Sequence, residues 1–283
     1  MIRALTLLLI LQLGIIVALY GPREGDTPVP GTFLALSVSD IEEVLISDGD
    51  SEVQLRRDDA TWTAAGLPVD AARVQRLLVA LGQDPGFRIA DSSSAPTRFS
   101  VAEDHFERRI DLHSAEGNAR VYLGNAPSFG KTHARRDGED GIYALSLNSF
   151  DVPADLNGWL DRSLLARSNP AALELYGARF DRGDDGWERE DGTPVDSATL
   201  EPLLEALARL QVTGVADPAA ADDEVDESLH LTIDGSELRL LHDSDDDRYY
   251  LHSERHDTLF DLSSLDAERL LEGARALGDE APT

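Results

Sequence analysis

The segment from Gly124 to Thr132, Gly-Asn-Ala-Pro-Ser-Phe-Gly-Lys-Thr, contains the residue types of a phosphate-binding loop. In such a loop, glycines let backbone amides surround the phosphate, while a lysine and a hydroxyl group contact it. Here one residue too many separates the two glycines, and a strand is predicted to follow where the site requires a helix. The sequence therefore favours a plain hairpin loop over a nucleotide site.

Four basic side chains lie at the end of this loop and just after it. They are Lys131, His133, Arg135 and Arg136. In a chain with 54 acidic and 25 basic residues, this cluster is a candidate interaction patch for an acidic protein surface or an anionic glycan. Pairing with the carboxylates of residues 137–140 is the alternative, and we favour it.

One acidic segment resembles part of a calcium site. Part of the spacing of a calcium loop is matched by Asp243, Asp245 and Asp247, with Glu254 downstream. However, Arg248 stands where that loop requires glycine. Strands are predicted on both sides instead of helices. A solvated acidic turn is therefore favoured.

Two histidines resemble part of a zinc site. His252 and His256 are four residues apart, but Ser253 replaces the glutamate of the zinc-protease helix motif. The preceding Tyr249-Tyr250-Leu251 favours a strand, on which both rings would lie on one face. Without a third ligand we expect surface histidines. We predict no metal site, no cofactor and no catalytic residue, since the chain also lacks cysteine and a Gly-x-Ser-x-Gly motif.

Composition limits the classes of partner. The formal net charge is −29, so the folded chain should repel nucleic acid and anionic lipid headgroups. Lys131 is the only lysine, and such a surface fits solubility or a saline habitat better than a cationic partner. The 283 residues, 42% of them hydrophobic, suffice for two domains with cores.

An apolar run near the N-terminus predicts a membrane anchor. Ala4 to Tyr20 has only Thr6 and Gln12 as polar side chains. This length is at the short end of the membrane-spanning range, and a poor signal-peptidase site follows. We predict an uncleaved single-pass anchor in a bacterial inner membrane, with its positive N-terminal flank in the cytoplasm. The bulk of the chain would then be periplasmic or otherwise extracytoplasmic.

The rest of the chain repeats one pattern: a tryptophan ends a strand, a Pro-Val-Asp turn follows, and an amphipathic helix begins. The residues are Trp62, Pro68 and Asp70 in one copy and Trp187, Pro194 and Asp196 in the other. The helices carry matching apolar stripes, namely Val74, Leu77, Leu78 and Leu81, then Leu200, Leu203, Leu204 and Leu207. We predict a duplicated unit, with its tryptophans and Trp159 in the cores.

Strands are predicted around both helices. They lie at 41–63, 110–123, 132–135 and 142–147 in the first copy and at 229–240 and 259–262 in the second. Pro202 lies within the second helix, where proline removes a hydrogen bond. This helix should therefore be kinked or begin later, capped by Thr199. Ser264 is predicted to cap a last helix at 265–277.

These elements predict an α+β fold of two tandem units, each a mostly antiparallel sheet packed by a helix. The expected divisions are the anchor at 1–21, a proline-rich linker at 22–38, the units at 39–168 and 169–278, and a tail at 279–283.

Five short motifs carry a resemblance to a known family. They are Phe106-Glu107-Arg108-Arg109-Ile110, Val121-Tyr122-Leu123-Gly124, His133-Ala134-Arg135-Arg136, Gly141-Ile142-Tyr143-Ala144 and Trp159-Leu160-Asp161-Arg162-Ser163-Leu164-Leu165. With the single anchor and Trp62, they resemble the domain-of-unknown-function family numbered 4340. The resemblance implies an envelope protein that is an auxiliary component of a gliding-motility-type ABC transport system. It brings no catalytic residues.

Three functional hypotheses follow. The first, which we favour, is a non-enzymatic membrane-anchored scaffold whose partner is an ABC transporter permease or another envelope protein. The second is a periplasmic module that binds a small ligand or glycan between the two units. The third is an envelope hydrolase with a metal at His252 and His256.

Overall fold

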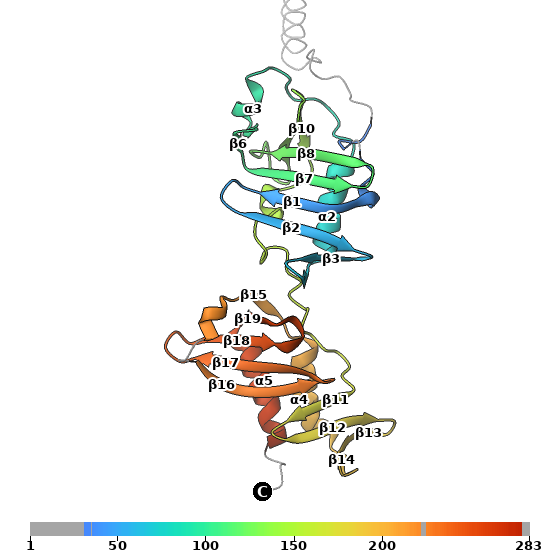
Figure 1. Cartoon of the computed structure of the whole chain (residues 1–283), viewed down its shortest axis with the longest axis vertical. Coiled ribbons are helices and arrows are strands. Elements are labelled where there is room, and N and C mark those ends of the chain that lie inside the picture. The colour runs from blue at the N-terminus through green and yellow to red at the C-terminus, as the bar shows by residue number, and fades with distance from the viewer. Residues whose placement is uncertain (1–30, 35, 222–224, 279–283) are drawn as a thin grey trace, which may run out of the picture. The chain divides into compact units, whose positions relative to one another are not determined.

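We describe the fold from a computed structural model, in which residues 31–34, 36–221 and 225–278 are described. The predicted anchor, most of the linker and the tail lie outside these ranges. No helix within them is both long and apolar enough to cross a bilayer. The chain divides into two compact units (Figure 1). The first contains the described residues up to 62 and residues 72–155, and the second contains residues 63–71 and those from 156 onward.

The first sheet has eight strands, in the order β10-β9-β8-β7-β1-β2-β3-β4. They are β1 (Ile41–Ser47), β2 (Glu52–Asp58), β3 (Thr61–Ala64), β4 (Leu67–Pro68), β7 (Arg108–Ser114), β8 (Gly117–Leu123), β9 (Thr132–Arg136) and β10 (Ile142–Leu145). The smaller elements are η1 (Val38–Asp40), α3 (Ala95–Arg98), η2 (Ser149–Asp151) and a hairpin of β5 (Val101–Ala102) and β6 (His105–Phe106). The hairpins predicted in this region are confirmed.

Local chemistry explains the first hairpin. The Asp48 carboxylate accepts hydrogen bonds from the backbone amides of Asp50 and Ser51, at 3.1 and 2.8 Å. Gly49 has a φ of 100°, which a residue with a side chain rarely adopts. An aspartate that closes its own turn in this way fixes the register of β1 against β2.

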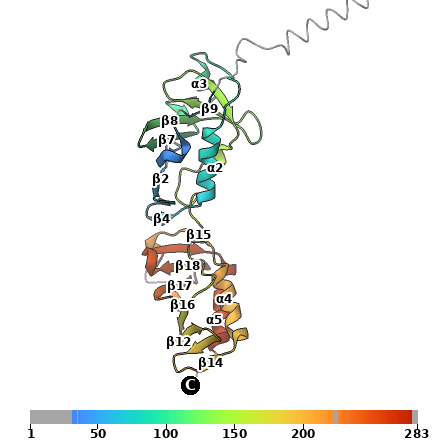
Figure 2. The same ribbon diagram turned by 90° about the vertical axis from the view of Figure 1, so that its right-hand side faces the viewer.

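Helix α2 (Ala71–Gly82) lies along one face of the first sheet (Figures 1 and 2). The four stripe residues predicted from the sequence, Val74, Leu77, Leu78 and Leu81, are all buried. The sheet contributes alternate residues, including Ile46 and Leu55, which are fully buried. Burying each such side chain contributes about 1.5–3 kcal/mol, so this face holds α2 in place.

The second sheet has nine strands, in the order β14-β13-β12-β11-β16-β17-β18-β19-β15. They are β11 (Ala172–Leu175), β12 (Ala178–Gly183), β13 (Gly186–Arg189), β14 (Pro194–Val195), β15 (Val212–Val215), β16 (Val225–Ile233), β17 (Ser236–Asp243), β18 (Arg248–Ser253) and β19 (Thr258–Leu262). The helical elements are α4 (Ser197–Ala208), α5 (Ser264–Gly278), η3 (Pro218–Ala221) and η4 (Glu254–His256). Both sheets are mostly antiparallel, as the α+β prediction requires.

The two units share one topology. In each, four strands form one half of the sheet, a 12-residue helix follows, and four more strands extend the sheet from its first strand. The outer edges of the two sheets also correspond, at the matching strands β10 and β19. Ala90 forms an isolated bridge to Ile142 of β10, and in the second unit β15 pairs with β19. The repeat predicted from Trp62 and Trp187 is therefore present in the strand order as well as in the helices.

Two predictions about helix ends need correction. Helix α4 begins at Ser197 with Asp196 as its N-cap, whose side chain accepts from the Ala198 amide at 3.0 Å. A later start at Thr199 is therefore wrong, and Pro202 lies inside the helix. Helix α5 is capped by Ser263 rather than Ser264, because the Ser263 hydroxyl accepts from the Asp266 amide at 3.1 Å and donates to the Asp266 carboxylate.

The division between the units also differs from the expected boundary at residue 168. The Asp70 amide donates to the Trp159 carbonyl at 2.8 Å, and the Asp161 amide donates to the Pro68 carbonyl at 3.0 Å. Leu67 and Leu160 belong to the second unit's core. The turn before α2 therefore belongs to the second unit, although α2 itself belongs to the first.

The contact between α4 and α5 gives a test of this core. A Cβ added at Gly273 would lie 2.6 Å from the Leu203 Cα. We expect Gly273→Ala to lower the free energy of unfolding, because overpacking costs about 1–3 kcal/mol and outweighs alanine's helix preference of about 1 kcal/mol. Chemical denaturation measures the change. Glu268→Ala, at an exposed position of the same helix, is the control, and a Gly273→Ala protein as stable as this control would contradict the packing.

Candidate functional site: a groove beside helix α2

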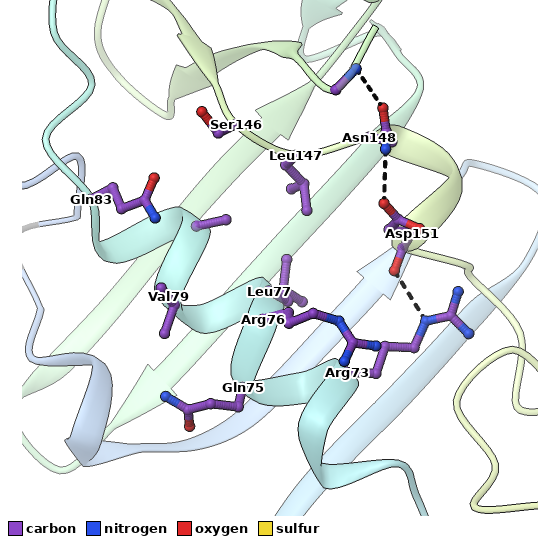
Figure 3. Close-up of a pocket in the computed structure, with 12 residues that line it drawn as sticks. Arg73, Gln75, Arg76, Leu77, Val79, Gln83, Ser146, Leu147, Asn148 and Asp151 are labelled. Carbon is purple, nitrogen blue, oxygen red and sulfur yellow. Dashed lines mark hydrogen bonds between the residues drawn. The ribbon is translucent and has the colours of Figure 1, made fainter.

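A groove of about 430 Å³ runs beside α2 in the first unit. One wall is α2, including Arg73, Arg76 and Val79, with Gln83 just after its last residue. The other wall is formed by Gly130, Ser146, Leu147, Asn148 and Asp151 (Figure 3). We call this feature the α2 groove. It is a surface depression large enough to receive side chains from another molecule.

The helical period explains which α2 residues reach the groove. Arg73, Arg76, Ala80 and Gln83 follow one another at intervals of three or four residues, so they share one face of the helix. This face adjoins the stripe that packs in the core, and Leu77 belongs to both. The groove wall is therefore held rigidly by the same helix that covers the sheet.

Hydrogen bonds hold the opposite wall. The Gly130 amide donates to the Asn148 side-chain oxygen, and the Asn148 side-chain nitrogen donates to the Asp151 carboxylate, each at 3.0 Å. The Arg73 Nε then donates to the Asp151 carbonyl at 3.3 Å, which joins this wall to α2 (Figure 3). The network links three separate segments of the chain, so the groove keeps its shape without a ligand.

The groove combines an apolar floor with a charged rim. Leu77, Ala80 and Leu147 are buried beneath it, whereas Val79 on the helix is 44% exposed. Arg73 and Arg76 place two positive charges at the rim of a chain whose net charge is −29. Apolar contact area beside a few charges is the chemistry of a recognition surface.

Two exposed aromatic residues adjoin the groove. Phe129 is 101% exposed and precedes Gly130, and Phe150 is 88% exposed and precedes Asp151. Single exposed hydrophobic residues are common on protein surfaces. Each of the two phenylalanines would gain about 1.5–3 kcal/mol from burial. Exposed aromatic residues of this kind are frequent energetic centres of protein interfaces.

The basic cluster predicted as an interaction patch is not one exposed surface. Lys131 is exposed, but His133 and Arg135 are buried. The Arg135 guanidinium donates to the Val101 and Glu139 carbonyls, at 2.7 and 3.1 Å, and lies over the ring of Tyr122. Arg136 pairs with the Glu139 carboxylate at 2.7 Å. Pairing with a nearby carboxylate, the favoured alternative, therefore describes Arg136 but not Arg135, whose partners are backbone oxygens.

The segment resembling a phosphate-binding loop is a connection between β8 and β9. A strand follows it, so no helix N-terminus faces it, as predicted. His133 holds the loop instead, because its Nδ1 lies 2.8 Å from the Asn125 carbonyl oxygen and 2.7 Å from the Asn125 Oδ1. The Asn125 carbonyl oxygen can only accept, so the His133 Nδ1 carries a proton and donates it. The ring of Phe99 packs against the His133 imidazole, with 4.5 Å between the two ring centroids.

The acidic segment from Asp243 to Asp247 forms the turn between β17 and β18. The Asp243 carboxylate accepts from the amides of Asp245 and Asp246, at 3.0 and 3.3 Å. Glu254 instead accepts from the Glu237 amide at 3.0 Å. Within the described part of the chain, no three acidic or histidine side chains gather in a way that could hold a metal ion.

The two histidines do not share a strand face, contrary to expectation. His252 lies on β18 and its Nδ1 is 3.3 Å from an Arg239 nitrogen. The strand ends at Ser253, so His256 lies on η4, with its ring edge-on to Phe260. The reason is the turn at Asp257, whose φ is 46°, which reverses the chain into β19.

The three tryptophans are core residues, as predicted. Trp62, Trp159 and Trp187 are 7%, 0% and 6% exposed. Pro68 ends one short edge strand and Pro194 begins another, which suits a residue without an amide hydrogen. These residues support the units and leave no open ring face on which a sugar could stack.

Sequence reasoning missed the α2 groove. Helical spacing could have placed Arg73, Arg76 and Gln83 on one face, but it gave no sign that Val79 is exposed there. The available signal was an asymmetry: a helix was predicted after the last strand of the second unit and none at the same place in the first. With this difference, the groove beside α2 is about 430 Å³ and the matching crevice beside α4 is about 210 Å³.

The buried histidine gives a pH prediction. Burial lowers the pKa of His133 below its ordinary value of 6.5. The unfolded chain therefore binds more protons in the window below pH 6.5, and the free energy of unfolding should fall as the pH falls, by at most about 1.4 kcal/mol per pH unit, until the folded pKa is reached. His133→Asn, which can keep a donor near Asn125, should reduce this dependence. Thermal melts between pH 7 and 5 measure it, with His105→Asn as the exposed control; an unchanged pH dependence would contradict the assignment.

Comparison with known proteins identifies the family. The family model described as Domain of unknown function (DUF4340) matches residues 61–231, more than half of the chain. This range includes α2, α4 and all the residues that line the α2 groove. No curated protein and no solved structure matches the chain. The chain belongs to the DUF4340 family, a domain family of unknown function.

Proposed function

We propose that the protein is a non-enzymatic scaffold, anchored in the membrane by its N-terminal apolar run, that binds a subunit of an ABC-type transport system. The observation that carries the binding role is the α2 groove, with its apolar floor and its exposed Phe129 and Phe150. Exposed aromatic side chains beside a preformed depression support a partner of macromolecular size.

The groove supports protein binding better than small-ligand binding. It is a shallow surface feature along a helix, and the aromatic side chains beside it are almost completely exposed. A small ligand would leave much of Phe129 and Phe150 in water, whereas a protein surface could cover both. The charged rim at Arg73 and Arg76 would orient such a partner.

The other two hypotheses receive less support. A glycan-binding module would be expected to use tryptophan faces, but Trp62, Trp159 and Trp187 are buried. A metal-dependent hydrolase would need His252 and His256 to converge, but they lie on separate elements with other contacts. The transporter as partner rests on the association of the family described above, and the membrane location rests on Ala4 to Tyr20.

Co-purification tests this function. The full-length chain, including residues 1–21, is tagged at its C-terminus, crosslinked in intact membranes and purified in a mild detergent. We expect a permease or ATPase subunit of an ABC-type transporter to be enriched. The same tag on an unrelated single-pass protein is the control. If neither subunit is recovered above this control, the proposed function is wrong.

A further inference from the structure

The chain enters the first unit beside the end of helix α2. The Phe33 amide donates to the Gln83 carbonyl at 2.8 Å, and the Arg136 guanidinium donates to the Phe33 carbonyl at 3.2 Å. The Phe33 ring is fully buried and lies edge-on to the ring of Tyr143, with 5.7 Å between the ring centroids. Gln83, which directly follows α2 (Figure 3), therefore marks the point at which the N-terminal segment joins the folded unit.

This attachment limits how far the first unit can lie from the predicted anchor. The apolar run ends at Tyr20, and a fully extended chain from Tyr20 to Phe33 reaches at most about 45 Å. The end of α2 that carries Gln83 is therefore within reach of the membrane surface in the anchored protein.

Two exposed apolar side chains follow this end of α2. Phe87 is 55% exposed and Ile89 is 43% exposed. The backbone beside them is fixed to the edge of the first sheet, because the Ile89 amide donates to the Ile142 carbonyl at 2.7 Å and the Ile142 amide donates to the Ala90 carbonyl at 2.8 Å. Phe87 and Ile89 are therefore presented to solvent from a hydrogen-bonded framework.

The charges beside these two side chains have local partners. Arg88 is the only charged residue from 85 to 90, and its guanidinium lies 3.5 Å from the Asp91 carboxylate. The Asp84 carboxylate accepts a hydrogen bond from the Gly86 amide at 2.8 Å. Apolar contact, and not charge attraction, is therefore the interaction that residues 85–89 offer. We call these residues the 85–89 segment.

Exposed apolar residues are concentrated in the first unit. Within the described residues, five of the seven large hydrophobic residues that are exposed belong to it. They are Val79, Phe87, Ile89, Phe129 and Phe150, whereas Tyr176 and Leu265 belong to the second unit. The chain is also less acidic here, since residues 31–155 contain 21 acidic and 12 basic residues, against 31 and 11 in residues 156–283. Both differences fit a unit that is held beside a membrane.

We infer that the 85–89 segment contacts membrane lipid, with Phe87 and Ile89 inserted at the boundary between headgroups and acyl chains. The inference rests on the anchor of the proposed function and adds a second point of contact with the bilayer. Two such side chains alone bind a bilayer weakly. The tether holds them beside it at an effective concentration on the order of millimolar, so a weak contact suffices to keep the first unit in one orientation toward the membrane.

Other occupants fit the 85–89 segment less well. The tether at residues 21–32 has Val29 as its only large aliphatic side chain and also carries Glu24 and Asp26, so it offers little apolar area. A second copy of this chain brings another net charge of −29, and the two copies repel one another. Zwitterionic lipid offers apolar acyl chains without a net charge.

A fluorescent probe at position 87 tests the inference. The chain contains no cysteine, so one introduced cysteine, Phe87→Cys, carries the probe alone. The full-length chain is reconstituted at one chain per phosphatidylcholine nanodisc, with quenching nitroxide groups on the lipid acyl chains. The matched control carries the probe at Leu265→Cys, a position that is also 55% exposed but lies in the second unit. We expect quenching to be at least threefold stronger at position 87.

A substitution beside the probe distinguishes apolar insertion from simple proximity. With the probe at Ile89→Cys, we expect Phe87→Asp to lower quenching at least threefold, because a charged side chain opposes insertion. Phe129→Asp is the matched control and should leave quenching unchanged. Both variants should melt at the temperature of the parent protein, since both side chains are exposed. Added salt should not change the quenching, because salt screens charges and the contact is apolar.

Three results would overturn the inference: equal quenching at positions 87 and 265, no effect of Phe87→Asp, or loss of quenching at high salt, which would indicate charge attraction. If one of them occurs while the chain stays bound to the nanodiscs and co-purification recovers the transporter subunit, the proposed function stands and only the lipid contact fails. A chain that does not stay bound to nanodiscs would contradict the anchor on which both proposals depend.

Discussion

The apolar face of each antiparallel sheet must be covered, and the rest of the structure depends on this requirement. An antiparallel sheet can leave one face in water but needs an apolar partner for the other. In the second unit α4 and α5 both contribute buried leucines to the core, whereas in the first unit α2 has only the short segment at residues 146–151 beside it. The apolar face is therefore covered in two ways, which leave a groove of about 430 Å³ beside α2 and a smaller crevice of about 210 Å³ between α4 and α5.

The turns and the buried face of each helix can be predicted from local sequence, because interactions between neighbouring residues determine them. Asp48 closes its own turn, and the stripe from Val74 to Leu81 can bury only one side of a helix. The strand order and the extent of coverage depend on distant contacts, so they could not be predicted in the same way. The repeat itself was visible, since Pro-Val-Asp precedes α2 and α4 alike.

The predictions that failed concern which side of an element is covered and where a helix begins. Alternation along β9 shows which residues share a face, but it does not show that Arg135 lies beneath the β5–β6 hairpin, where backbone oxygens satisfy its guanidinium. Burial of a charged group is tolerated only with such partners. For α5, Ser264 was predicted as the cap, but the hydroxyl of Ser263 accepts from the Asp266 amide instead. A shift of one residue at a helix end lies below what periodicity can resolve.

The groove illustrates how a repeated helix can keep its packing while its outward residues change. The two helices bury the matching pairs Leu77 with Leu203 and Ala80 with Ala206, so both retain the packing needed for stability. The outward positions differ, with Arg76 and Val79 in place of Pro202 and Glu205. These positions are free to change because they do not support the core. Arg76 and Val79 are exposed, as are Pro202 and Glu205, so packing constrains one face of each helix and leaves the adjacent face open to substitution.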